Sequence, residues 1–71
     1  MIKELDIVSL TTDVPSAELE AGEEGTIVHV YPSNTDFEVE FPAKKGRSGV
    51  VASLPSTSIR PLSPVDSELR N

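Results

Sequence analysis

The amino-acid sequence predicts a very small all-β domain, and three observations indicate this class. Phe37, Val39 and Phe41 alternate with Glu38 and Glu40, a period of two that is typical of a strand with one buried face. A polar turn rich in Pro, Ser, Asn and Asp separates this run from an earlier apolar run, as in an antiparallel hairpin. The chain has 71 residues and no cysteine, so it forms one domain at most and has no disulfide framework.

Two strands are expected in the front half of the chain. The first covers residues 6–11 and ends before Pro15, because proline cannot donate a hydrogen bond to a strand ladder. The second covers residues 26–31. It is apolar on both sides, which favours a central position in a curved sheet.

The long segment between these strands predicts turns rather than regular structure. Residues 16–20 are expected to form a single helical turn capped by Ser16, with Leu19 as its apolar anchor. Gly22 and Gly25 bracket two glutamates, and we expect both glycines to serve turn geometry because glycine adopts positive φ at no steric cost.

The back half of the chain is expected to contain three further strands, a basic loop and a tight helical turn. In chain order these are strand 37–41, loop 42–49, strand 49–54, helical turn 55–58 and closing strand 59–62. Val50, Ala52 and Leu54 share one face of the fourth strand. The tail, residues 63–71, holds proline, serine and alternating charge, so we expect it to be disordered or loosely docked beside a domain of residues 1–62.

Five short strands with one helical turn before the last predict a Src-homology-3-like small barrel. Closure of the sheet removes most of its unpaired edges, which a tiny β protein needs. The alternative fold is a small oligonucleotide-binding-type barrel, which usually has more residues and a longer helix between its third and fourth strands.

The charge pattern favours a basic protein as partner. The net charge is −6, and no Lys or Arg occurs between Asp13 and Glu40. Such an acidic flank repels nucleic acid and attracts cationic surfaces, although net charge alone also keeps small domains dispersed. The predicted partner-binding residues are Glu18, Glu20, Glu23, Glu24, Tyr31, Glu38 and Glu40.

A nucleic-acid interface is the alternative interpretation of the basic loop 42–49. Lys44, Lys45 and Arg47 could contact phosphates there. Binding of single strands also uses aromatic stacking platforms, and the chain has only three aromatic residues. Nucleic acid is therefore the less favoured partner.

No motif predicts catalysis, a cofactor or a metal. His29, the only histidine, lies in an apolar strand and is expected to be a structural or rim residue on the same face as Ile27 and Tyr31. The glutamates do not have the spacing of a calcium loop. Glu38 and Glu40 lie on one face, rather than across a cleft as in a glycosidase. We expect a non-enzymatic protein that is soluble and cytoplasmic, because no long apolar run or signal peptide is visible.

The sequence also resembles a known family. The segments that carry the resemblance are 2–8, 21–31, 37–41 and 59–62, which read IKELDIV, AGEEGTIVHVY, FEVEF and IRPL. They are similar to small bacterial proteins of the DUF4926 type, whose members share a Gly-Asp-x-Gly-Thr-Val-Val turn and strand and a terminal Leu-Arg-Pro. Glu23 stands where this family usually has aspartate, and the weaker similarity of residues 44–53 leaves the register of the fourth strand open.

The resemblance implies no established activity. Genes of this type often lie beside toxin–antitoxin genes, which implies a neutralising or accessory protein. We therefore expect an interaction module with an antitoxin-like role, or else a structural accessory subunit of a larger enzyme. Open edges at the first and last strands would also permit a homodimer.

Overall fold

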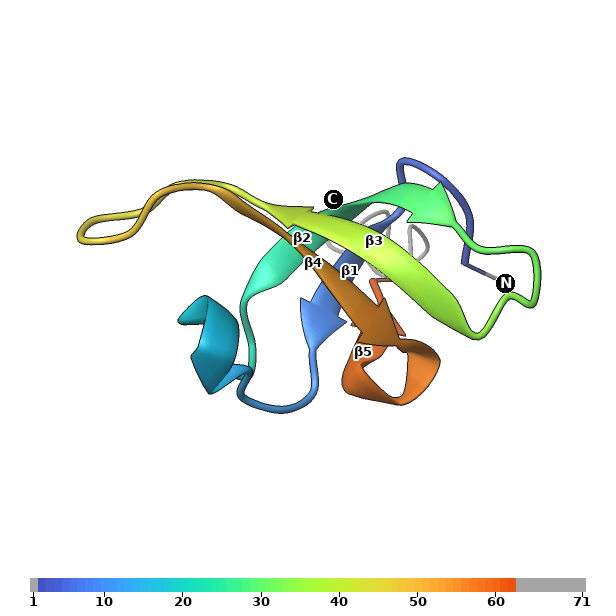
Figure 1. Cartoon of the computed structure of the whole chain (residues 1–71), viewed down its shortest axis with the longest axis horizontal. Helices are drawn as coiled ribbons and strands as arrows, with labels where there is room; N and C mark the ends of the chain where they lie inside the picture. Colours follow the sequence, from blue (N-terminus) through green and yellow to red (C-terminus); the bar gives the residue numbers. More distant parts are fainter. Residues whose placement is uncertain (1, 63–71) are drawn as a thin grey trace, which may run out of the picture.

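A computed structural model describes residues 2–62 as one antiparallel sheet with two short 3-10 helices (Figure 1). The strands are β1 (Ile7–Leu10), β2 (Glu24–Val30), β3 (Asp36–Phe41), β4 (Val50–Pro55) and β5 (Ile59–Pro61). The helices are η1 (Pro15–Ala17) and η2 (Ser56–Ser58). The expected all-β class and the five strands are confirmed. The tail 63–71 lies outside the described residues.

The strand order in the sheet is β4-β3-β2-β1-β5. β2 is central, as its apolar sequence predicts. Within residues 2–62 no pairing joins β4 to β5, so the sheet is curved but not closed, and the expectation of a closed barrel is wrong. Among the described residues the free edges are therefore β4 and β5. The expected open edge at the last strand is confirmed, whereas the first strand, β1, is not an edge because it lies between β2 and β5.

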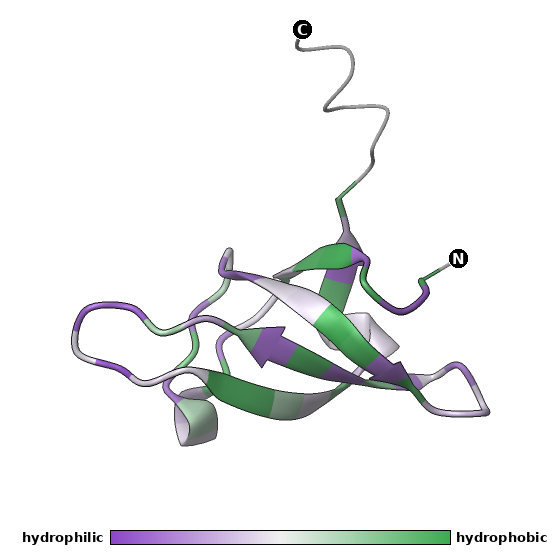
Figure 2. Cartoon of the chain, turned by 90° about the horizontal axis from the view of Figure 1, so that it is seen from above, coloured by the Kyte–Doolittle hydropathy of each residue, from purple (hydrophilic) through white to green (hydrophobic). Residues whose placement is uncertain are grey.

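One face of the sheet wraps around a single hydrophobic core. Because side chains alternate along a strand, the apolar residues of β3 all point into this core. Apolar side chains of β1, β2, β4 and β5 point to the same face and pack against them. Figure 2 shows the same alternation of hydrophobic and hydrophilic residues along the strands. The buried core residues are Val8, Leu10, Leu19, Ile27, Phe37, Val39, Phe41, Leu54 and Ile59. No helix among the described residues is long and apolar enough to cross a membrane.

A β-bulge in β2 changes which side chains face outward. The register with β3 shifts between Ile27 and His29, so Val28 is an extra residue on this strand. Ile27 is buried whereas His29 is exposed. The expectation that these two residues share a face is therefore wrong, while the expectation of His29 as a rim residue agrees with its exposure.

The segment before β2 departs from prediction at two residues. The 3-10 turn η1 begins at Pro15, with Val14 at its N-cap and no side-chain cap, so Ser16 lies inside the turn rather than capping it. Gly25 is part of β2 and not of a turn. A Cβ at Gly25 would lie 2.8 Å from the Glu40 carbonyl oxygen, so this glycine permits close packing against β3 instead of a positive φ.

Candidate functional site

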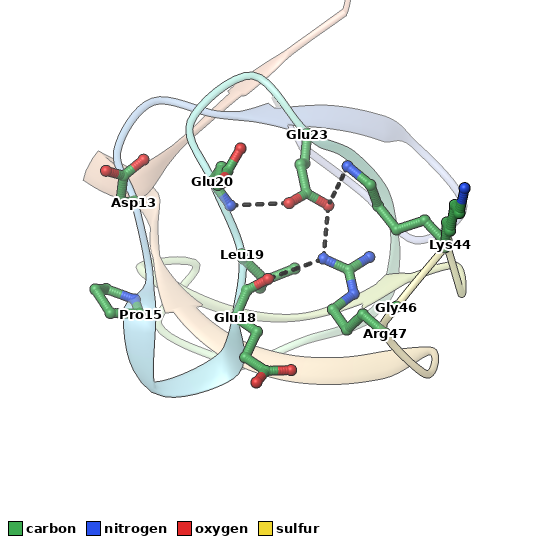
Figure 3. A pocket seen from close by; sticks show the side chains of 10 residues that line it. Asp13, Pro15, Glu18, Leu19, Glu20, Glu23, Lys44, Gly46 and Arg47 are labelled. Atoms are coloured by element: carbon green, nitrogen blue, oxygen red, sulfur yellow. Dashed lines mark hydrogen bonds and ion pairs between the residues drawn. The ribbon is translucent and has the colours of Figure 1, made fainter.

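Two loops that are distant in sequence meet around an open hollow of about 490 Å³ (Figure 3). One loop connects β1 to β2 and supplies the four carboxylates that line the hollow. The other connects β3 to β4 and supplies the cations. The lining residues are Asp13, Pro15, Glu18, Leu19, Glu20, Glu23, Lys44, Lys45, Gly46 and Arg47.

The side chain of Arg47 links the two loops through hydrogen bonds. Its Nη1 donates hydrogen bonds to Glu23 Oε1 at 2.8 Å and to the Glu18 carbonyl oxygen at 3.1 Å, and its Nη2 donates to the Pro42 carbonyl oxygen at 2.8 Å. The side chain of Arg47 is only 9% exposed and that of Glu23 only 12%. A guanidinium suits this position because its planar fork satisfies several acceptors at once.

Local turns place both members of this ion pair. The Glu20 backbone N–H donates to Glu23 Oε2 at 2.9 Å, which orients the carboxylate (Figure 3). Reciprocal backbone hydrogen bonds between Lys44 and Arg47 form a tight turn at the loop tip. Gly46 has φ +84° in that turn, a conformation that glycine adopts without strain.

The ion pair lowers the pKa of the Glu23 carboxyl below its usual range. The hydrogen bond from Arg47 is the main cause, followed by the hydrogen bond from the Glu20 backbone. Lys44 lies farther away, with its Nζ 3.9 Å from Glu23 Oε1 and its side chain largely exposed. Glu23 and Arg47 were predicted for different binding surfaces, and the structure shows them bound to each other.

The rest of the hollow carries charges of both signs. The carboxylates of Asp13, Glu18 and Glu20 come from the loop between β1 and β2, and the ammonium groups of Lys44 and Lys45 come from the loop between β3 and β4. Asp13 Oδ1 accepts a hydrogen bond from the Ala21 backbone at 2.8 Å. Sequence patterns did not identify Asp13, because nothing in its local sequence shows that the loop folds back on it.

A second polar cluster lies on the outward face of β2, β3 and β4. The hydroxyls of Tyr31 and Ser53 both donate to Glu38 Oε2. These bonds lower the pKa of Glu38, with Ser53 the larger cause, and the bond to Glu38 raises the pKa of Tyr31. The His29 ring packs edge-on against Tyr31, with 4.8 Å between ring centroids.

The hydrogen bonds of this second cluster differ from those of a catalytic nucleophile and its base. Glu38 accepts two hydrogen bonds and has a lowered pKa, so it is a weak base. No hydrogen bond among the described residues links Ser53 to His29, as a nucleophile–base pair needs. Tyr31 belongs to this cluster and does not line the hollow. Residues 2–62 contain no group of three or more His, Asp or Glu that could hold a metal ion.

The other predicted carboxylates are exposed and separate. Glu24 and Glu40 lie on β2 and β3, while Glu18 and Glu20 lie at the rim of the hollow. No side-chain hydrogen bond or ion pair from another described residue reaches these four carboxylates. The predicted partner-binding carboxylates therefore divide into two sets. Glu18, Glu20, Glu24 and Glu40 are exposed, whereas Glu23 and Glu38 bind other residues of the protein, Glu38 together with Tyr31.

Comparison with protein families matches residues 4–61 to the domain of unknown function DUF4926. The chain belongs to this family. The match covers all five strands and both loops around the hollow, and it confirms the family that the sequence resembles. Searches of curated proteins and of solved structures found no match.

Proposed function

We propose that this DUF4926 protein is a non-enzymatic interaction module that binds the basic surface of a partner protein. The observation that carries the proposal is the presence of exposed carboxylates at the rim of the hollow that have no side-chain partner among the described residues. Arg47 is neutralised by Glu23, whereas Glu18 and Glu20 stay exposed at the rim. Carboxylates without internal partners are available to cations on another protein, and such complementarity steers association.

An antitoxin-like role is the sharpest form of this proposal. A toxin that cleaves RNA has a cationic cleft, and exposed carboxylates can occupy positions that the cleft offers to phosphates. Glu24 and Glu40 extend the acidic surface beyond the hollow. An accessory subunit of a larger enzyme would use the same surface, and the identity of the partner distinguishes the two roles.

The fold supports an interaction role by analogy. The strand order and the 3-10 turn before β5 are compatible with an opened Src-homology-3-like sheet, and we propose that relationship. Folds of this size host many functions, so the analogy adds little to the charge argument.

The nucleic-acid alternative has less support. Arg47 is the strongest phosphate ligand among the loop cations because of its bidentate geometry, but its guanidinium is bound to Glu23 and to two carbonyl oxygens. Lys44 and Lys45 are left, and they lie beside exposed carboxylates. A gel shift at low salt with mixed RNA and single-stranded DNA tests this alternative.

The proposal is tested by affinity capture from native lysate with the full chain as bait. We expect one or more basic proteins to be retained at low salt and released as salt rises, because exposed charge pairs are screened. A triple variant, Glu18→Lys, Glu20→Lys and Glu24→Lys, should retain none of them. Identified partners are then measured by association kinetics, where the variant should slow association more than it speeds dissociation.

The matched control is Lys44→Glu with Lys45→Glu, which leaves the exposed glutamates in place. This variant should bind the same partner at least as well as the wild type. Equal capture by the wild type and the triple variant, or binding that does not respond to salt, contradicts the acidic-surface proposal.

A further inference from the structure

β4 forms one edge of the sheet, and its pairing with β3 shows which of its backbone N–H and C=O groups point outward. Among residues 2–62 it pairs with β3 on one side only. The Ser56 backbone N–H donates to the Thr35 carbonyl oxygen at 2.8 Å, so Thr35 and Ser56 form a hydrogen-bonded pair. Two residues further along each strand, Phe37 and Leu54 form the next hydrogen-bonded pair, whereas the pairs Glu38–Ser53 and Glu40–Val51 are not hydrogen-bonded. Because hydrogen-bonded and non-hydrogen-bonded pairs alternate in an antiparallel ladder, the N–H and C=O groups of Val51 and Ser53 point away from β3.

This edge has little of the usual protection against strand pairing, because Pro55 blocks only its last position. No charged residue occurs between Arg47 and Arg60, and Val51 is 54% exposed. Sheet edges are normally protected by charges, by proline or by short length. The opposite edge has these features, because β5 is only three residues long and contains Arg60 and Pro61.

We propose that the β4 edge pairs with β4 of a second copy of the chain. An antiparallel arrangement with Ala52 opposite its own equivalent places Val51 opposite Ser53 of the second copy, and Ser53 opposite Val51. Each of these two pairs can exchange two backbone hydrogen bonds. On the core side Val50 then faces Leu54 of the second copy, so the apolar faces of the two sheets are continuous.

Local charge at this edge does not oppose a second copy, and the edge offers no carboxylate to a basic partner. The chain has a net charge of −6, so two copies repel wherever their acidic surfaces meet, but β4 itself is neutral. In the proposed pairing Glu40, opposite Val51 on β3, lies three strand spacings, about 14 Å, from Glu38 of the second copy. That separation exceeds the Debye length of about 8 Å at physiological salt. The dimer thus leaves the exposed glutamates accessible and does not depend on the proposed function.

Sedimentation equilibrium of the full chain tests the proposal. Edge pairing buries a small area, so we measure from about 10 μM to about 1 mM, the range of weak complexes. We expect the wild type to dimerise. Val51→Lys should raise the dissociation constant at least tenfold, because it places a charge on the pairing edge.

Val28→Lys is the matched control, since Val28 is also an exposed valine, 41% accessible, but lies in the central strand β2. It should dimerise like the wild type. A wild type that stays monomeric over the whole range, or a Val51→Lys variant that dimerises equally, overturns the proposal.

Backbone hydrogen exchange by NMR gives a second, site-specific measurement. The amides of Val51 and Ser53 should exchange more slowly as the protein concentration rises, while that of Lys45 in the loop tip should not change. A dimer that leaves Val51 and Ser53 unprotected uses another surface and contradicts the proposed pairing. The same spectra show whether Val51→Lys remains folded.

Discussion

Gly25 shows how a single hydrogen atom in place of a methyl group permits the packing of β2 on β3. A Cβ at this position would lie 2.8 Å from the Glu40 carbonyl oxygen, 2.8 Å from Val39 Cγ1 and 2.9 Å from Phe41 Cδ2. Two of these neighbours are buried core side chains and the third is backbone, so none can move freely. We expect Gly25→Ala to lower the free energy of unfolding by about 2–3 kcal/mol, the upper part of the range for overpacked cores.

Urea unfolding, followed by fluorescence of Tyr31 or by circular dichroism, measures this effect as a shift in the midpoint. Gly49→Ala is the control, because the atoms nearest to its added Cβ lie at 3.4 Å or beyond, in ordinary contact. It should change stability little. Equal loss in both variants would contradict the explanation that the close packing at Gly25 causes the effect.

At the scale of structural elements, the link between the two loops depends on one ion pair. We expect Arg47→Met and Glu23→Gln each to destabilise the fold, and the double variant to lose less than the sum of the two, because breaking a pair leaves its partner buried and unsatisfied. Lys44→Met is the control, since its ammonium lies 3.9 Å from Glu23 and is largely exposed, and it should have little effect. The unfolding free energies of the wild type, the two single variants and the double variant provide the coupling energy. Strictly additive losses would contradict the link.

The elements that the sequence predicted well are those with a strong local pattern. The alternation in β3 identified its buried phenylalanines, and the two-sided apolar run in β2 identified the central strand. The bulge at Val28 was not predicted, because an inserted residue leaves no signature in an apolar run. The failure of β4 and β5 to close the sheet was not predicted either, since closure depends on the twist and length of whole strands.

The candidate site was predicted less well because it is formed by residues that are distant in the sequence. Composition identified the acidic and basic residues, but Glu23 and Arg47 are 24 residues apart and meet only through the tertiary fold. Tyr31 was predicted as a partner-binding residue together with the acidic residues, and the structure places it in the cluster on the outward face of the sheet, where it binds Glu38. Charge counts predict which residues are available for binding, and the fold decides which of them bind internally.

The pH dependence of stability is a property of the whole molecule. Asp6, Glu23 and Glu38 have lowered pKa values, caused chiefly by hydrogen bonds from Lys3, Arg47 and Ser53 respectively. Depressed carboxyl pKa values add stability at pH values above the pKa of the unfolded chain, and this stability is lost as the pH falls through the folded pKa. We expect the unfolding free energy to be level above about pH 5 and to fall below about pH 4.

Urea midpoints from neutral to acidic pH, at moderate and at high salt, test this dependence. High salt screens the repulsion among the charges of the chain, whose net charge is −6. The loss of unfolding free energy at acidic pH should therefore persist at high salt. Glu23→Gln removes one of the three titrating carboxyls and should flatten the curve. Stability that rises on acidification in high salt would contradict the assignment.

The outward face of the sheet has a practical consequence. Ile7, Thr26, Glu40 and Val51 follow one another across four strands in direct register, and no helix among residues 2–62 covers them. Their side chains point away from the core, so many substitutions there leave the buried packing intact. A library randomised at these four positions could therefore select new recognition surfaces on a very small scaffold without redesign of its interior.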